Sequence, residues 1–429
     1  MFGFANFLLL ALFAAAVFDL IFALARGGGL RGALHGLWNT PHLLFGQQLA
    51  EWRLQLGRIL FAAGLAAYEI SVVFCNSMAR QNWAWVQGVM SPVLEWLAFL
   101  CFGAKILFGT RYTWRELLAG GALYFIARWV YFNSQNIWWI GIVVAVLAAK
   151  DVRLRRPLQV YFASGCAAMA VVLALHFAGI VAPDLTSERM GALRGTYGYG
   201  HPNTFGGLVF GLVLAYALLR AQKVRWVDCL LVFAVGVFLL VGPASRSAAL
   251  CTLALAVGLV FCRLRAGHSV PRWWPGTCAG MVGLTAAVSY LLPLLVIKVG
   301  PWNNDIGPAW LAKLDSLLTC RISLTWMAYR LLDVKIAGQV FNWPTVDNSF
   351  AFALFQFGPV VAALLGILFA AALLGHAKQG RRVEVCCLFA MLAYAYMEVQ
   401  PFHLTTNPTA LLLCGAVFAQ TSARWQKIE

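Results

Sequence analysis

Apolar runs long enough to cross a bilayer recur along the whole 429-residue chain. A helix of about 18 or more apolar residues spans a hydrocarbon core of about 30 Å, and a spanning segment must satisfy its own backbone hydrogen bonds in lipid. Charged residues make up only 11% of the chain, against about a quarter in soluble domains. The sequence therefore predicts an all-α, polytopic membrane protein that forms a single domain over residues 1–429.

The apolar pattern predicts about 12 to 13 transmembrane helices. The first run lacks a basic stretch before it and a small-residue cleavage site after it, which favours a retained span over a signal peptide. The eleven cysteines form no CxxC pair and no Cys/His spacing typical of a metal site,. The expected helices lie at about residues 3–25, 56–78, 86–109, 114–132, 135–149, 157–182, 204–220, 226–242, 247–262, 277–297, 349–374, 383–397 and 408–422.

The net charge of +16 is distributed in short basic clusters between the apolar runs. This pattern indicates topology signals and contact with anionic lipid, not nucleic acid. With thirteen spans every cluster falls on one side, which the positive-inside rule makes the cytoplasm, so the N-terminus is expected outside and the C-terminus inside. The clusters are Arg26 and Arg31, Arg53 and Arg58, Lys105 to Arg115, Lys150 to Arg156, Arg220 to Arg225, Arg263 to Arg272, Lys378 to Arg382, and Arg424 to Lys427.

Four polar links are then expected on the outer face. They are residues 183–203, "GPASRS" at 242–247, the large extracytoplasmic loop 298–348, and "EVQPFHLTTN" at 398–407. The large loop contains "LAKLDSLLTCRISLTWMAYRLLDV", an amphipathic pattern that predicts one or two helices lying along the membrane surface.

A few arginines lie on this outer face, where basic residues are otherwise rare. Arg246 is the most informative, because it interrupts two apolar runs at the membrane boundary, where an unpartnered charge is costly. Arginine binds phosphate groups through a planar fork of donors, so Arg194, Arg246 and Arg321 are predicted to converge on a diphosphate headgroup. The alternative is that each arginine snorkels or pairs with one acid, such as Asp184, Glu188 or Asp315.

The most polar link ends in "RGTYGYGHPNTFGG", residues 194–207. Its glycines disfavour a helix, and a proline after His201 pushes that residue toward extended geometry. Pro202 and Asn203 then suit a helix start, so the pattern predicts a loop re-entering toward the membrane and a helix N-terminus that favours anions. Tyr197 and Tyr199 either stack on a sugar or lie at the bilayer interface. The alternative is a flexible turn with a structural proline.

This stretch resembles the signature of O-antigen ligases and Wzy-type polysaccharide polymerases. Further similarities follow in the family's order over about residues 190 to 410: "SRSAAL", "LDSLLTCRISL" around Arg321, and "TVDNSFAFALFQFG". Glu398 with Asn407 is a weaker fifth match. All five lie on the face that the charge pattern places outside.

The resemblance implies a metal-independent and cofactor-free glycosyltransferase of the GT-C class, which uses a glycan on undecaprenyl diphosphate as donor. A polymerase transfers the chain to another lipid-linked repeat unit, and a ligase transfers it to lipid A-core. Ligases carry a functional histidine in the large outer loop, and residues 298–348 contain none, so the resemblance favours a polymerase for capsule, exopolysaccharide or O-antigen. The alternatives are a ligase and a lipid-linked oligosaccharide flippase or transporter, although the paired halves typical of many transporters are not found.

The implied setting is the bacterial cytoplasmic membrane, with the active site on its extracytoplasmic face. The implied partners are the lipid-linked oligosaccharide, membrane lipids, a flippase and a chain-length regulator.

Glycosyl transfer from a diphosphate needs stabilised leaving oxygens and a base for the acceptor hydroxyl. Arg246 and Arg321 are assigned to the diphosphate. Candidates for the base are His201, Asp347, Glu398 and His403; a histidine pKa near 6.5 favours His201, although a structural hydrogen bond is the alternative. Asp347 is alternatively a helix cap, and Glu398 alternatively orients an arginine. The expected substrate-binding residues are Arg194, Tyr197, Tyr199, Asn203, Asn348, His403 and Asn407, with helix capping as the alternative for Asn203 and Asn348.

Overall fold

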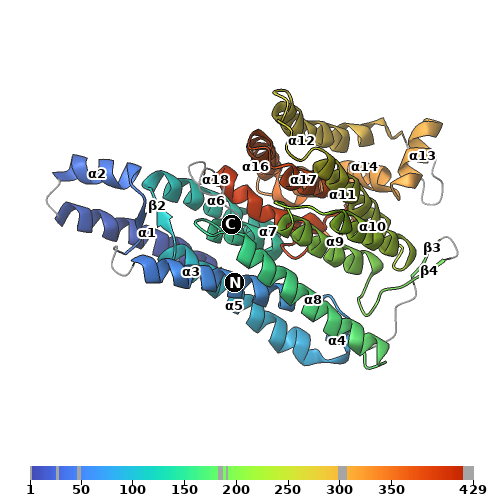
Figure 1. The fold of residues 1–429 in the computed structure, drawn as a ribbon, viewed down its shortest axis with the longest axis horizontal. Coiled ribbons are helices and arrows are strands. Elements are labelled where there is room, and N and C mark those ends of the chain that lie inside the picture. Colours follow the sequence, from blue (N-terminus) through green and yellow to red (C-terminus); the bar gives the residue numbers. More distant parts are fainter. Residues whose placement is uncertain are drawn as a thin grey trace. The chain divides into compact units, whose positions relative to one another are not determined.

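The computed structural model describes residues 2–25, 29–45, 50–181, 187–189, 192–297 and 307–418, and Figure 1 shows its fold. The chain is mostly helical. Eight helices among the described residues are long and apolar enough to cross a membrane, and three shorter apolar helices accompany them. The chain is therefore a multi-pass, helical membrane protein, as the apolar runs predict.

The chain divides into two compact units, each made of segments that are distant in sequence. Unit 1 comprises residues 1–128, 140–208 and 410–429, and unit 2 comprises residues 129–139 and 209–409. Three α-helices, α6, α7 and α9, and the 3-10 helix η5 contain residues of both units.

Unit 1 is built around α3, which packs against both α5 and α8. The approach of α3 to the end of α5 requires glycine: a Cβ on Gly57 would lie 2.8 Å from the Cα of Gly109. Its elements are α1 (Phe2–Ala25), α2 (Gly29–Asn39), β1 (His42–Leu43), α3 (Ala50–Cys75), α4 (Ala79–Asn82), η1 (Val86–Met90), α5 (Ser91–Phe108), β2 (Arg111–Tyr112), most of α6 (Trp114–Ser134) and α7 (Ile137–Ala148), α8 (Arg155–Phe177), β3 (Ser187–Arg189), β4 (Ala192–Arg194), the start of α9 (Pro202–Leu219) and α18 (Cys414–Val417).

The strands of unit 1 form two short antiparallel pairs. In the first pair His42 lies opposite Tyr112, and in the second Ser187 lies opposite Arg194. The second pair is a hairpin that leads directly into the glycine-rich stretch before α9.

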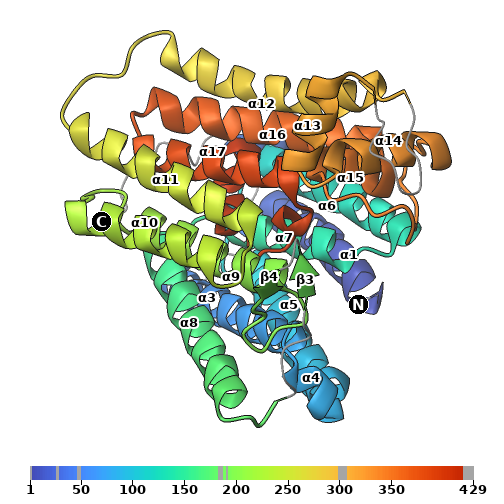
Figure 2. The same ribbon diagram turned by 90° about the vertical axis from the view of Figure 1, so that its right-hand side faces the viewer.

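Unit 2 is a set of neighbouring apolar helices. Figure 2 shows α10 beside α11, α11 beside α17 and α12 beside α16. Its elements are most of α9, α10 (Trp226–Val241), α11 (Arg246–Leu264), α12 (Trp274–Leu291), η2 (Leu292–Leu295), α13 (Ala309–Leu317), α14 (Arg321–Leu331), α15 (Ser349–Phe352), η3 (Ala353–Phe357), α16 (Pro359–Lys378), α17 (Arg382–Met397), η4 (Gln400–Phe402) and the start of η5 (Pro408–Leu413).

Most predicted helices are found within a few residues of their expected bounds, but two are wrong in form. The run at 349–374 is not one helix, because it is broken at Gly358, whose φ of +88° and close approach to the carbonyl of Ile336 (2.1 Å from a built Cβ) only glycine tolerates,. In the described part of the run at 408–422, residues 408–418, a 3-10 helix is followed by the four-residue α18. The helix α2 was not predicted, since its residues lack a long apolar run.

The described residues of the large loop, 307–348, contain two helices, α13 and α14; their predicted position along the membrane surface stays a prediction. Residues 298–306 of this loop, together with Asp184, Arg26 and the C-terminal basic cluster at 424–427, lie outside the described residues.

The two ends of unit 2 gather the segments that the charge pattern assigns to opposite faces. At one end Arg382 donates hydrogen bonds to the carbonyl oxygens of Arg265 and His268, which joins two of the predicted cytoplasmic clusters. At the other end the start of α11, the loop before α15 and the link after α17 come together through Ser247, Ser349 and Glu398. These two sets of contacts therefore lie at opposite ends of α11 and α17; the assignment of the two ends to membrane faces stays a prediction.

Candidate functional site

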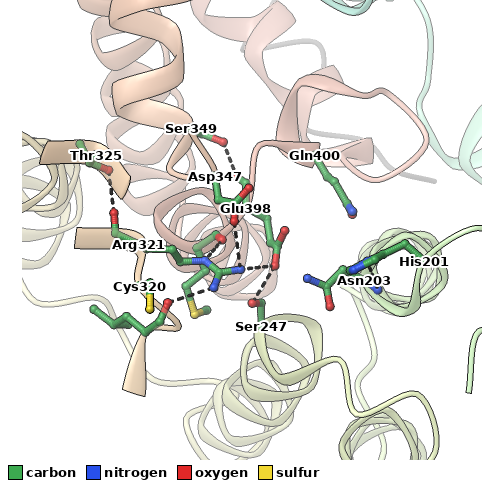
Figure 3. A network of polar contacts seen from close by, with 12 residues as sticks. His201, Asn203, Ser247, Cys320, Arg321, Thr325, Asp347, Ser349, Glu398 and Gln400 are labelled. Atoms are coloured by element: carbon green, nitrogen blue, oxygen red, sulfur yellow. Dashed lines mark hydrogen bonds and ion pairs between the residues drawn. The ribbon is translucent and has the colours of Figure 1, made fainter. Parts of the chain in front are cut away.

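The centre of this second end is an ion pair between Arg321 and Glu398, shown in Figure 3. The Arg321 Nη2 lies 2.7 Å from the Glu398 Oε1, and the two residues are only 7% and 5% exposed. The same guanidinium donates from Nε to the Met397 carbonyl and from Nη1 to the Leu318 carbonyl at 2.9 Å. Arg321 is thus held by three acceptors in one orientation.

Glu398 is also bound from a second helix. The hydroxyl of Ser247, in the first turn of α11, donates to the same Oε1 at 2.9 Å, and the hydroxyl of Ser349 donates to the Glu398 backbone carbonyl at 2.5 Å. Burial raises the pKa of Glu398, while the Arg321 guanidinium opposes that increase. Glu398 therefore orients an arginine, Arg321, which is the alternative role that the sequence predicts for it.

A local turn presents Arg321 as the first residue of α14. Cys320 adopts a left-handed backbone with φ of 64° and ends the preceding turn. The Asp315 carboxylate then accepts hydrogen bonds from the backbone N–H groups of Ile322 and Ser323, at 2.8 and 3.2 Å, and so satisfies donors that a helix start leaves open. Asp315 therefore caps the helix, and Arg321 pairs with Glu398 instead of the predicted alternative Asp315.

Asp347 and its neighbour Asn348 have different roles in the fold. The Asn348 side chain accepts from the N–H groups of Phe350 and Ala351, and it donates to the Ser289 hydroxyl at 3.1 Å. Asn348 is therefore the cap of α15, which was one of its two predicted roles, and Asp347 is not the cap. The Asp347 carboxylate lies 3.9 Å from the Arg321 Nη2 and its side chain is 31% exposed.

Arg246 is the first residue of α11 and is exposed. Its neighbour Ser247 donates a hydrogen bond to Glu398. Arg246 therefore directly precedes a residue that contacts the ion pair. Sequence reasoning did not single out Ser247 or Ser349. Both lie inside stretches that the sequence analysis singles out, "SRSAAL" and "TVDNSFAFALFQFG", and each directly follows a predicted site residue, Arg246 and Asn348.

The last link of unit 2 is tied down by its own polar side chains. The His403 ring lies against the Trp138 ring with centroids 3.7 Å apart, and burial lowers the pKa of His403 to about 3. Asn407 donates to the Pro401 carbonyl at 2.9 Å and accepts from the Thr409 hydroxyl at 2.5 Å. The contacts of both predicted substrate-binding residues support the fold of the link.

In unit 1 the glycine-rich stretch forms a chain of hydrogen bonds at the start of α9. The Arg194 Nη2 donates to the Asn203 Oδ1 at 2.8 Å, and the Asn203 backbone N–H donates to the His201 Nδ1 at 3.1 Å. Arg194 is 6% exposed, whereas His201 is exposed. The imidazole of His201 therefore acts at the helix start as a cap.

The two tyrosines of this stretch face the interior. Tyr197 stacks on Phe205 with centroids 5.0 Å apart, and Tyr199 has no exposed surface. The loop is fastened to the end of α3, where the Met78 N–H donates to the Gly198 carbonyl at 2.8 Å. The prediction that Tyr199 offers its ring to a sugar is wrong for this conformation, because the ring is buried by its packing against Phe205.

The structure thus brings Arg321, Asp347 and Glu398 together, and Arg246 directly precedes Ser247, which binds Glu398. Arg194, Asn203 and His201 form a separate group in unit 1. Among the described residues no group of three His, Cys, Asp or Glu side chains is arranged to hold a metal. Comparison of the chain with known protein families, with curated proteins and with solved structures finds no match.

Proposed function

We propose that the protein is a glycosyltransferase that polymerises undecaprenyl-diphosphate-linked oligosaccharides on the outer face of the bacterial cytoplasmic membrane. The proposal includes the fuller topology of 12 to 13 spans, with the large loop outside. It rests on one observation: two arginines and two carboxylates lie where the polar links of unit 2 meet at the end of a bundle of apolar helices.

The leaving group is a lipid diphosphate, and the arginines offset its charge. Arg321 has five N–H donors, of which three are used by protein acceptors. Arginine binds phosphate oxygens well, so we assign the other two donors of Arg321 and the exposed side chain of Arg246 to the diphosphate. Because Arg321 is already fixed by its protein partners, it stabilises developing charge without reorganising.

Asp347 is the base that the geometry favours. It is the more exposed of the two carboxylates, and its Oδ2 lies 3.9 Å from the Arg321 Nη2. In the proposed step the acceptor hydroxyl gives its proton to Asp347, its oxygen bonds to the anomeric carbon, and the bond from that carbon to the diphosphate breaks. The diphosphate leaves with the electron pair. Glu398 positions Arg321 and does not contact substrate.

The histidine candidates fit the role of base less well. His403 is a very weak base with a pKa of about 3. A neutral imidazole that accepts a hydrogen bond at Nδ1 carries its proton on Nε2, so His201 in the observed conformation is a donor. In this proposal His201 and Arg194 shape the start of α9 within unit 1.

Reconstitution into proteoliposomes with a synthetic undecaprenyl-diphosphate repeat unit tests the proposal. The wild-type protein should produce a ladder of longer glycans, and Arg246→Ala should remove it. Arg263→Ala is the matched control, because Arg263 is also exposed and lies in the last turn of the same helix.

Ladders that persist in Arg246→Ala would overturn the diphosphate assignment. Movement of the lipid across the bilayer without a glycan ladder would indicate that the protein is a flippase and not a glycosyltransferase. Transfer of glycan to lipid A-core, in place of a second repeat unit, would make it a ligase.

A further inference from the structure

A pocket of about 620 Å³ lies between α3 and α8 and is lined by residues of unit 1 alone. Four arginines line it: Arg58 from α3, Arg153 from the preceding loop, and Arg155 and Arg156 from the first turn of α8. Apolar side chains, among them Ile59 and Val160, line the remainder. The pocket therefore combines a strongly positive rim with an apolar wall.

The positive charge of this pocket is not offset by nearby acids. The structure gives none of the four guanidinium groups an ion pair within the described part of the chain. The two nearby carboxylates are used elsewhere: Glu116 and Asp151 lie 3.3 and 3.6 Å from the Lys150 ammonium. The first turn of α8 contains no acidic residue, so its helix dipole adds further positive potential.

The apolar wall indicates what kind of anion the pocket receives. Ile59 is 65% exposed beside Arg58, and both helices that border the pocket qualify as membrane spans. A free phosphate has no apolar part that could contact this wall. A phospholipid can place its acyl chains against the wall and its phosphate on the arginines. The arginines also belong to two clusters that the sequence predicts on the cytoplasmic face, where anionic lipids are found.

We propose that this arginine-lined pocket binds the headgroup of an anionic phospholipid, with the phosphate held by Arg58, Arg153, Arg155 and Arg156. The lipid binds from the surrounding leaflet and occupies the space between α3 and α8. Because α3 also packs on α5, a bound lipid stabilises the packing of the central helices of unit 1 against unfolding.

Native mass spectrometry and thermal unfolding of the full chain in detergent test the proposal, with dioleoyl phosphatidylglycerol, dioleoyl phosphatidylcholine and inorganic phosphate as the three probes. The wild-type protein should retain phosphatidylglycerol and unfold at a higher temperature with it. The variant R58Q/R153Q/R155Q/R156Q should bind that lipid at least about tenfold more weakly, since each basic residue contributes to anionic lipid affinity.

The matched control is K223Q/R263Q/R272Q/K378Q, which removes the same charge from four exposed positions of unit 2. It should keep wild-type affinity for phosphatidylglycerol. Equal losses in the two variants would reduce the effect to overall charge and overturn the proposal, as would equal binding of phosphatidylcholine. If inorganic phosphate raises the unfolding temperature as much as phosphatidylglycerol does, the ligand is a soluble anion and the proposal of a lipid is wrong. A pocket variant that unfolds without lipid at the wild-type temperature shows that the fold itself is intact.

Discussion

The buried pair of Arg321 and Glu398 predicts a large coupling energy between two residues that are 77 positions apart. The perturbations are Arg321→Met, Glu398→Gln and the two together, which remove either charge or both while keeping most of the side-chain volume. Each single variant leaves a charge that is less than a tenth exposed without its partner. Such a loss costs about 3–5 kcal/mol in the free energy of unfolding.

The double variant should cost much less than the sum of the single variants, because no unpaired charge remains in it. The expected coupling energy is about 2–4 kcal/mol, toward the lower end since Asp347 lies 3.9 Å from the guanidinium and partly compensates it. Reversible unfolding of the purified protein in mixed micelles, followed by circular dichroism, measures all four free energies.

The control is the pair of Arg220 and Asp228, whose atoms approach to 3.1 Å but whose arginine side chain is 31% exposed. Water screens that pair and Tyr216 also holds Asp228, so its coupling should be about 1 kcal/mol or less. The double variant could instead cost the sum of the two single variants to within about 0.5 kcal/mol. That result would show that the two charges do not depend on each other and would refute the reasoning.

Three further predictions concern other residues. Asp347→Asn should lower kcat for glycan polymerisation by about 10²–10⁴-fold, the usual contribution of a general base, with little change in the unfolding temperature; a kcat within threefold of wild type would exclude Asp347 as the base. His403 has a folded-state pKa of about 3 below its unfolded value near 6.5, so the unfolded chain binds the proton first and stability should fall as pH drops below about 6.5. The loss between pH 7 and pH 5 is about 2 kcal/mol, and His403→Asn should remove that part of the pH dependence in unfolding titrations at the two pH values. Gly358→Ala should destabilise the protein by about 2–4 kcal/mol, because its Cβ would lie 2.1 Å from the Ile336 carbonyl oxygen at a φ of +88°,; Gly366→Ala, whose Cβ meets nothing within 4 Å, should be neutral or slightly stabilising, and equal melting temperatures for the two variants would contradict this.

The helices are the part of the fold that the sequence predicts best. Long apolar runs such as those of α8, α11 and α12 report directly on burial in lipid, and their bounds agree with the structure to within a few residues. The break at Gly358 escapes such reasoning, since it depends on the backbone of Ile336, which is distant in sequence and enters only through the fold.

The candidate site divides in the same way. Charge placement singles out Arg194, Arg246 and Arg321, because arginines are rare on the predicted outer face and an unpartnered charge at the membrane boundary is costly. It does not reveal that Glu398 and Ser247 bind each other, nor that Asp315 serves as a cap while Glu398 takes the ion pair. Those facts depend on which helix ends meet, and no local pattern in this chain encodes that.

The short segment at 410–418 has a consequence for the order of assembly. It belongs to unit 1, where the Phe418 ring lies 6.3 Å from the Tyr112 ring and 5.6 Å from the Lys150 ammonium. A ribosome delivers residues 1–128 and 140–208 early, but it delivers this segment only after nearly all of unit 2. The first half of the protein must therefore wait in the membrane, incomplete, until the second half has been made.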